Sequence, residues 1–466
     1  MSRAETLGEL RASGWESRPV KEELRTNAVA KIAAGEPLFD GVMGYEDTVL
    51  PQLENAILAG HDVIFLGERG QAKTRMIRSL TNLLDEWMPI IAGSEIYDDP
   101  YAPISRYAID LVEEHGDDTK IDWIHRDDRF GEKLATPDTS IADLIGEVDP
   151  IKVAEGRYLS DELTLHYGLV PRTNRGVFAI NELPDLAERI QVGLLNILEE
   201  RDVQVRGYKV RLPIDVMLVA SANPEDYTNR GRLITPLKDR FGSQIRTHYP
   251  LEVDTEMEIA LQEARFLDAP GVTVTVPDVM TEIVATFSHV ARSSPQVNQR
   301  SGVSVRMTVS NLEVMVANAA RRTLAQGETH VVPRVSDLDA LVASTSGKIE
   351  IESMEDGREG QIIEHMLRQS VLEVFRSRFT SEETRAVVDG FEDGKVAHVG
   401  DDMPVGDYST LVDDVPALAE IVASVEGGDD PAVAASIVEL VLEGLHLSKR
   451  LNKDSIGARA TYRGRG

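Results

Sequence analysis

The chain has 466 residues, of which 42% are hydrophobic, and its 49 Lys and Arg against 79 Asp and Glu give a formal net charge of −30. This length predicts about two to four domains with ample core, and so negative a surface disfavours nucleic acid and anionic lipid as partners. The chain contains no cysteine, which excludes disulfides, thiolate metal sites and cysteine nucleophiles.

The first residues are polar and show no apolar signal core, and no later run is long and apolar enough to span a bilayer. We therefore expect a cytoplasmic protein without a membrane partner. Residues 1–35 predict an N-terminal helical extension, with a helix over 22–34 that Gly35 ends. Residues 38–47 are rich in turn formers and apolar side chains, which suit either an adenine-binding lip or plain core packing, and a helix is expected from Tyr45 to Leu58.

The strongest motif follows. Val63–Leu66 is a short apolar run typical of a buried strand, and a glycine-containing turn leads from it to Lys73 and Thr74 at the start of an amphipathic helix. This order is that of a phosphate-binding P-loop, in which backbone N–H groups surround a phosphate chain. The lysine of such a loop reaches the β- and γ-phosphates, and its hydroxyl residue binds Mg²⁺. The alternative is an ordinary strand–turn–helix with a surface lysine.

We expect the nucleotide to be bound by one continuous group of loop residues. They are Gly67, Gly70, Gln71, Ala72, Lys73, Thr74 and Arg75. The pattern Gly-x-x-x-x-Gly-Lys-Thr departs at one position, because Ala72 replaces the last glycine. Alanine is nearly as small, so close approach of the backbone to phosphate remains compatible with it.

Residues 87–137 are dense in turn formers and are interpreted as loop-rich. His125 lies among carboxylates there, but it lacks a second histidine at ligand spacing, so the metal signal is weak. The next apolar strand ends in Asn181 and Glu182, where a Walker B motif has an acidic pair. Glu182 is expected to polarise the attacking water, and Asn181 to contact Mg²⁺ through a bound water without adding negative charge.

Further strand and helix ends carry polar residues suited to the same site. Residues 203–212 alternate around a glycine and predict a hairpin, and the apolar strand after it leads to Asn223. Ligands of parallel sheets bind at the carboxyl ends of the strands, so Asn223 is expected near the γ-phosphate. Arg240 is expected near a helix end, and Arg306 in the first turn of a helix over 304–319.

The remainder predicts helices separated by acidic, glycine-rich connectors. The expected helices cover 362–379, 408–426 and 431–451, and the basic residues 451–466 are expected to form a disordered tail. Contact of this tail with nucleic acid is left open.

Together these residues resemble an AAA+ ATPase. Within that superfamily the chain is most similar to the ATPase (I) subunit of magnesium chelatase and to MoxR-type ATPases. Three stretches carry the closer resemblance, namely 92–100, 135–149 and the expected hairpin 203–212, and the likeness extends over about residues 38–345. It implies an α/β P-loop AAA+ core, a parallel sheet with helices on both faces, followed by an all-helical lid and a further helical C-terminal region.

The corresponding domain expectation has five parts. They are a helical extension over 1–35, the nucleotide-binding core over 36–250, the lid over 251–350, the C-terminal helical region over 351–450 and the tail over 451–466.

The resemblance also implies roles. ATP and Mg²⁺ are the expected cofactors, Asn181 and Glu182 form the Walker B pair, and Asn223 is sensor 1. Arg240 acts as an arginine finger on the nucleotide of a neighbouring subunit, and Arg306 is sensor 2. An arginine finger acting in trans implies a homo-oligomeric ring, typically a hexamer, and family members usually work with a von Willebrand factor A domain protein, a domain this chain lacks.

Three functions remain open on the sequence. The first is a ring-forming, chaperone-like ATPase that remodels or activates a partner, and the second is a nucleotide-gated assembly module with little hydrolysis because of Asn181. The third is a DNA-associated AAA+ protein, which the net charge of −30 disfavours and which Arg206, Lys209 and Arg211 favour locally.

Overall fold

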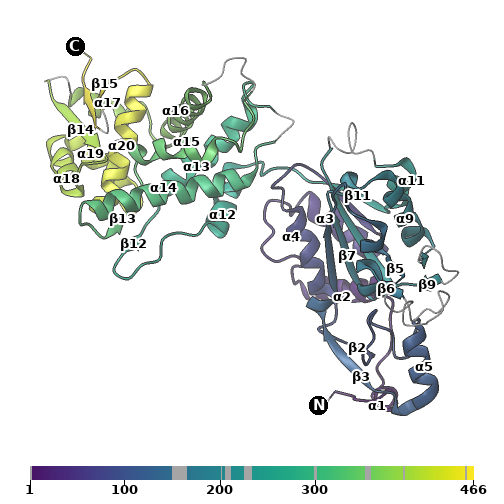
Figure 1. Ribbon diagram of the computed structural model, residues 1–466. Helices are drawn as coiled ribbons and strands as arrows, with labels where there is room; N and C mark the ends of the chain where they lie inside the picture. Colours follow the sequence, from purple (N-terminus) through teal and green to yellow (C-terminus); the bar gives the residue numbers. More distant parts are fainter. Residues whose placement is uncertain are drawn as a thin grey trace. The chain divides into compact units, whose positions relative to one another are not determined.

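We describe a computed structural model of the chain, shown in Figure 1. The structure describes residues 3–148, 165–200, 202–204, 211–224, 233–298, 302–351, 358–391, 394–456 and 459–465. The chain divides into two compact units, Met1–His248 and Tyr249–Gly466. Each unit is considered by itself below.

The first unit is built on a five-stranded parallel sheet in the order β11-β1-β10-β7-β4. The strands are β1 (Val63–Leu66), β4 (Phe130–Leu134), β7 (Gly176–Asn181), β10 (Val216–Ala222) and β11 (Ser243–Arg246). All residues of β1 and β10 are buried, as apolar strands covered on both faces should be.

Helices cover both faces of this sheet, and Figure 1 shows the two sets on opposite sides. One face packs against α2 (Val20–Ala34), α3 (Val49–Ala59) and α4 (Lys73–Ser79). The other packs against α9 (Glu188–Glu199) and α11 (Thr235–Arg240). The expected α/β core with helices on both faces is therefore confirmed.

Residues 87–137 differ most from expectation. Their turn formers predict a loop-rich stretch, but it contains β2 (Trp87–Ile91), α5 (Arg106–His115), β3 (Ile121–His125) and the sheet strand β4. Strands β2 and β3 pair with each other, and β4 pairs with β7, so their partners are distant in sequence or separated by a helix. Such pairings depend on tertiary contacts that local turn-forming residues do not reveal.

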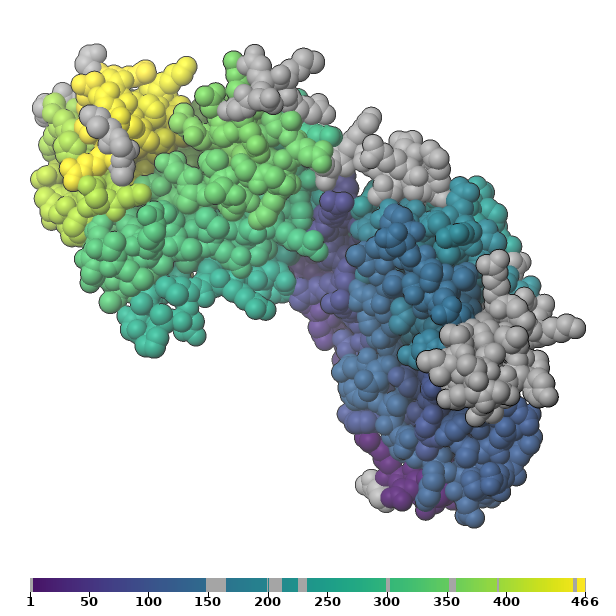
Figure 2. All heavy atoms as spheres, viewed as in Figure 1, coloured from purple at the N-terminus to yellow at the C-terminus, as the bar shows by residue number. Residues whose placement is uncertain are grey.

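The N-terminal residues belong to the packed unit. Leu7 and Leu10 of α1 (Leu7–Ala12) are fully buried, and the backbone N–H of Leu7 donates to Thr119 O at 2.9 Å. Figure 2 shows the purple N-terminal residues packed against the blue part of the same unit. The predicted helix over 22–34 is present as α2, and Gly35 ends it with a left-handed φ of 71°.

The remaining elements of the first unit surround the sheet. They are η1 (Leu80–Leu83), η2 (Gly116–Asp118), η3 (Arg126–Arg129), α6 (Ile141–Leu144), β5 (Gly146–Val148), β6 (Leu165–Tyr167), α8 (Leu169–Arg172), η5 (Leu183–Asp185), β8 (Asp202–Gln204) and β9 (Arg211–Pro213). Strands β8 and β9 are antiparallel, which confirms the described arms of the predicted hairpin. Arg206 and Lys209 lie outside the described residues.

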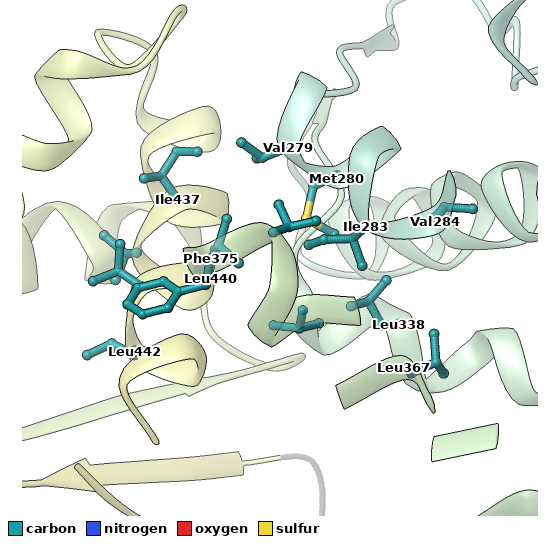
Figure 3. Packing of buried hydrophobic residues seen from close by; sticks show 14 of the residues in the cluster. Val279, Met280, Ile283, Val284, Leu338, Leu367, Phe375, Ile437, Leu440 and Leu442 are labelled. Atoms are coloured by element: carbon teal, nitrogen blue, oxygen red, sulfur yellow. The ribbon is translucent and has the colours of Figure 1, made fainter. Parts of the chain in front are cut away.

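The second unit is mostly helical, and the larger of its two apolar clusters continues from the expected lid into the C-terminal region. Figure 3 shows this core where α13 (Asp278–Ser293), α16 (Glu359–Arg378) and α20 (Pro431–Leu447) meet around residues such as Ile283, Phe375 and Leu440. The two regions that the sequence analysis separates at residue 350 thus share apolar packing.

The other elements of this unit complete the same body. They are α12 (Val253–Glu263), β12 (Thr273–Val274), α14 (Val305–Ala325), β13 (His330–Val331), α15 (Leu341–Thr345), α17 (Glu383–Asp389), β14 (Val396–Gly400), α18 (Val405–Asp414), α19 (Pro416–Ser424), β15 (Asn452–Ile456) and β16 (Arg459–Arg463).

Two expectations in this unit are wrong. The single helix expected over 408–426 is two helices, α18 and α19, because Pro416 cannot continue a helix and instead begins α19. The tail expected to be disordered forms β15 and β16, which join β14 in a three-stranded antiparallel sheet with Tyr462 buried. None of the helices in the described part combines the length and apolar character needed to span a bilayer.

Candidate functional site

The P-loop motif has the expected geometry, with strand β1, a turn and helix α4 in succession. Lys73 is the first residue of α4 and is 7% exposed. Its Nζ donates to the carbonyl oxygens of Gly67 at 2.5 Å and Glu68 at 2.7 Å, and to Asn223 Oδ1 at 3.5 Å. The lysine predicted to bind phosphate therefore points into the turn of its own loop, beside the end of strand β10.

Ala72 adopts the left-handed backbone conformation, with φ 52° and ψ 13°. This conformation costs an L-residue about 1–2 kcal/mol, whereas glycine adopts it freely. The usual motif has glycine at this position, where the backbone must be left-handed. Alanine is small enough to fit there, but it still carries the free-energy cost of the left-handed conformation.

The loop is held in shape by its own Gln71 and by Thr247 and Tyr45, which lie outside the motif. Gln71 Oε1 accepts from the backbone N–H of Glu68 at 3.0 Å and from Thr247 Oγ1 at 2.6 Å. The hydroxyl of Tyr45 donates to Gln71 O at 3.0 Å and lies 2.7 Å from His248 O. Burial raises the pKa of Tyr45, so this hydroxyl stays a donor across the physiological range.

Gly67 has no room for a side chain. A Cβ at this position would lie 1.8 Å from Thr247 Oγ1 and 2.2 Å from Gln71 Oε1.

Tyr45 is 4% exposed and lies within the core on the α4 face. Tyr45 is therefore a core residue that also supports the loop. These contacts do not test whether residues 38–47 bind adenine, so that role stays a prediction.

The predicted Walker B pair ends strand β7, next to β10 in the sheet. The backbone N–H of Glu182 donates to Ser221 Oγ at 3.2 Å, and Ser221 Oγ donates to Asn181 Oδ1 at 3.3 Å. Glu182 has a left-handed φ of 54°, a strained conformation of the kind concentrated at functional sites.

Glu132 is the residue that the sequence analysis missed. It lies on β4, and its Oε1 accepts from Asn181 Nδ2 at 2.5 Å, while its Oε2 accepts from Arg78 Nε at 3.0 Å and Nη2 at 2.7 Å. The weak signal for it is the short stretch 130–134, whose strand character depends on pairing with β7.

The predicted residues fall into two groups. Lys73, Asn181, Glu182 and Asn223 lie at the carboxyl ends of three adjacent strands, as the strand-end rule requires. Arg240 ends α11, which packs on the sheet face opposite α4, and its Nη1 donates to Pro236 O at 3.1 Å.

Three further residues complete the account. Thr74 follows Lys73 in the first turn of α4, and Arg75 next to it is exposed. Arg306 lies in the first turn of α14 in the second unit, where its backbone N–H donates to the capping Ser304 Oγ at 3.1 Å.

These groups fit a nucleotide bound with Mg²⁺. The Lys73 ammonium is compact and suits phosphate oxygens. The Thr74 hydroxyl is an oxygen ligand of the kind Mg²⁺ prefers, and Gly70, with φ 76°, supplies the turn.

The Sigma-54 interaction domain family model matches residues 155–240, which include β7, β10 and α11. Among curated proteins, the magnesium-chelatase 38 kDa subunit of Rhodobacter capsulatus is 28% identical over 234 residues, covering 47% of this chain and 59% of that protein. The chain therefore spans less than two thirds of that relative.

Other magnesium-chelatase subunits align over longer stretches. Subunit ChlI-1 of Arabidopsis thaliana is 27% identical over 320 residues, covering 63% of this chain and 70% of that protein. Subunit ChlI of Nostoc sp. PCC 7120 is 24% identical over 370 residues, covering 76% of this chain and 90% of that protein.

Solved structures give weaker likenesses. A model of the complex between subunits BchI and BchD of magnesium chelatase matches with a TM-score of 0.35 and 19% identity, covering 68% of this chain and 95% of that one. NtrX from Brucella abortus in complex with ATP matches with a TM-score of 0.40 and 13% identity, covering 77% and 67%. Both scores are low, so the assignment rests on the sequence relatives and the P-loop geometry. On those grounds the chain resembles the 38 kDa and ChlI subunits of magnesium chelatase, and its first unit has a P-loop α/β fold.

Proposed function

We propose that this chain is an ATPase that binds ATP with Mg²⁺ and hydrolyses it in a ring of identical subunits, in order to remodel or activate a partner protein. The observation that carries the proposal is that the P-loop turn and Asn223 both contact the ammonium group of Lys73. Its ammonium lies in the P-loop turn and within 3.5 Å of Asn223 Oδ1, at the strand ends where Glu182 also lies.

Each residue has a role in this reaction. Lys73 holds the β- and γ-phosphates, Glu182 accepts a hydrogen bond from the attacking water and polarises it, and Asn223 orients that water or the γ-phosphate. Thr74 would hold Mg²⁺, which neutralises charge developing between the phosphates.

The ring follows from the proposed arginine finger. Arg240 would complete the site of a neighbouring subunit, and Arg306 would act on the phosphates as sensor 2. Relatives are subunits of magnesium chelatase, and one solved relative is described as a complex of BchI with BchD. We accordingly propose a homo-oligomer, typically hexameric, whose client is a von Willebrand factor A domain protein or another partner, as for MoxR-type ATPases.

A second function is favoured by one residue. Asn181 carries no charge where the motif has a carboxylate, which would weaken Mg²⁺ binding and slow hydrolysis. The chain would then use ATP chiefly to drive assembly.

ATP turnover measured against protein concentration tests the ATPase proposal. Specific activity should rise with concentration, because Arg240 acts between subunits, and it should vanish in Lys73→Ala and in Glu182→Gln. Glu188→Gln, an exposed glutamate on α9, is the matched control and should keep full activity. Turnover equal to that of Lys73→Ala, with ATP still bound, would favour the assembly function instead.

Binding to DNA is the remaining function, and a gel shift at several salt concentrations tests it. Phosphate contacts weaken as salt rises, so a salt-sensitive shift would support it.

A further inference from the structure

We propose that Glu132 supplies the carboxylate that Asn181 lacks, so that the charge of the Walker B motif comes from the neighbouring strand. This inference rests on the proposed function, because it concerns the Mg²⁺ bound with ATP. Glu132 would act on metal-bound water together with Asn181, as a residue that positions and stabilises the ion.

The direct evidence is the contact between the two side chains. Asn181 Nδ2 donates to Glu132 Oε1 at 2.5 Å. The amide oxygen of Asn181 points the other way, where it accepts from Ser221 Oγ at 3.3 Å. One end of the amide thus holds a carboxylate, and the other remains an acceptor beside Glu182, whose N–H also binds Ser221.

The sheet places Glu132 on the side of the P-loop helix. Strand β4 is parallel to β7, with Glu132 opposite Ala179 and Leu134 opposite Asn181. Ala179 belongs to the core that includes Met76 and Ile77 of α4. Because side chains alternate along a strand, Ala179 and Asn181 share this face, and Glu132 reaches Asn181 on it.

Arg78 makes a second, independent contact that holds Glu132 in place. Its Nε and Nη2 both donate to Glu132 Oε2, at 3.0 and 2.7 Å. Arg78 lies four residues after Thr74 on α4, so the two side chains lie on the same face of the helix, one turn apart. Glu132 is therefore held between the strand end of Asn181 and the helix face that carries the proposed Mg²⁺ ligand.

The carboxylate keeps acceptor capacity in this arrangement. Its two oxygens offer about four lone-pair sites, of which Arg78 and Asn181 use three in the contacts above. The remaining site is on Oε1, the oxygen beside Asn181. The side chain is also 22% exposed, so water reaches it.

This arrangement suits Mg²⁺ in particular. Mg²⁺ usually keeps several waters and is bound through one or two carboxylates together with phosphate oxygens. Outer partners that hydrogen-bond the ligands typically change metal affinity by about 10–100-fold when removed. Glu132 would provide that stabilisation while Asn181 orients the water.

The test is the effect of Mg²⁺ on nucleotide binding, measured with a fluorescent ATP analogue on the full chain, with Mg²⁺ and with a chelator. In the unmodified protein Mg²⁺ should tighten binding. In Glu132→Gln this gain should shrink by about tenfold, while binding in chelator is retained. Glu188→Gln should keep the gain, and matching thermal unfolding of both variants excludes a folding defect.

A rescue variant separates this role from packing. Asn181→Asp combined with Glu132→Gln returns the carboxylate to its usual position and should restore the gain from Mg²⁺. An unchanged gain in Glu132→Gln, or a loss that Asn181→Asp does not restore, would overturn the proposal for Glu132. Failure of the unmodified protein to bind the analogue at all would instead overturn the proposed ATPase function.

Discussion

Ala72 carries a backbone strain that its side chain does nothing to offset. It is exposed and left-handed, with φ 52°, immediately before Lys73. Glu182 is left-handed as well, with φ 54°, so both the loop and the Walker B end hold non-glycine residues in an unfavourable conformation. Strain at two positions of one site indicates that the surrounding contacts, such as those of Gln71 and Ser221, hold the backbone there.

Ala72→Gly should therefore stabilise the protein. Relief of the left-handed conformation exceeds the added freedom of the unfolded chain, and we expect a gain of about 0.5–1 kcal/mol in the free energy of unfolding. Denaturant unfolding measures it.

Ala30→Gly is the matched control, because Ala30 is exposed in the middle of α2. In ordinary helical conformation the same substitution should destabilise by about 1 kcal/mol. If Ala72→Gly destabilised the protein as much as Ala30→Gly does, the claim that the backbone at Ala72 is strained would be wrong.

At the scale of elements, a buried ion pair joins α2 to Arg129, the residue directly before strand β4. Arg129 is fully buried, and its Nη1 and Nη2 donate to the two carboxylate oxygens of Glu23 at 2.7 and 2.6 Å. Arg129 also donates through Nε to Arg175 O at 2.9 Å, and Glu23 accepts from the backbone N–H of Asp85 at 2.7 Å. Helix α2 is thus integral to the first unit.

Glu23→Ala should destabilise the first unit by about 3–5 kcal/mol, because it leaves the buried Arg129 charge without its partner. Chemical denaturation followed by circular dichroism measures the loss. Glu22→Ala, at the exposed neighbouring position of the same helix turn, should change the stability little. Equal effects of the two substitutions would show that the pair contributes nothing specific.

At the scale of the whole molecule, two units each have their own apolar core.

A buried polar cluster joins three helices of the second unit. Arg292 of α13 donates to both oxygens of Glu256 of α12 at 2.5 and 2.8 Å, and Thr308 of α14 donates to the same carboxylate at 2.5 Å. His289 Nε2 lies 2.9 Å from Glu256 Oε2.

This cluster predicts acid sensitivity of the second unit. Burial by itself raises the pKa of Glu256. The close approach of His289, the hydrogen bonds from Arg292 and Thr308 and the Arg292 charge outweigh this effect, so the pKa is lowered. The ion pair therefore stabilises fully above the unfolded glutamate value of about 4.3, and this stabilisation is lost as the pH falls through the lowered folded pKa.

Glu256→Gln should remove about 3 kcal/mol at neutral pH and flatten the acid dependence, as followed by thermal unfolding between neutral and acid pH. Glu258→Gln, exposed on the same helix, should keep the acid dependence of the unmodified chain. If the thermal stability of Glu256→Gln still fell at acid pH as in the unmodified chain, the acid sensitivity would come from other carboxylates.

Local patterns were enough to predict the strand–turn–helix of the P-loop, the strands leading to Asn181 and Asn223, and the helices that the structure has as α2, α3, α14, α16 and α20. Their signals lie within a few consecutive residues: a glycine turn before Lys73, buried apolar runs, and helical spacing. The same local reading failed at 87–137 and at the C-terminal tail. Strand β4 pairs with the distant β7, and β16 pairs both with its hairpin neighbour β15 and with the distant β14.

The contact between Glu132 and Asn181 shows the limit most clearly. The sequence alone revealed that Asn181 lacks a charge, because that depends on residue identity. Only the tertiary structure placed a carboxylate from β4 beside it, because the parallel pairing of β4 with β7 brings Glu132 into contact with Asn181, 49 positions later in the chain. Which strands become neighbours depends on packing of the whole sheet, and the pattern within one strand does not specify it.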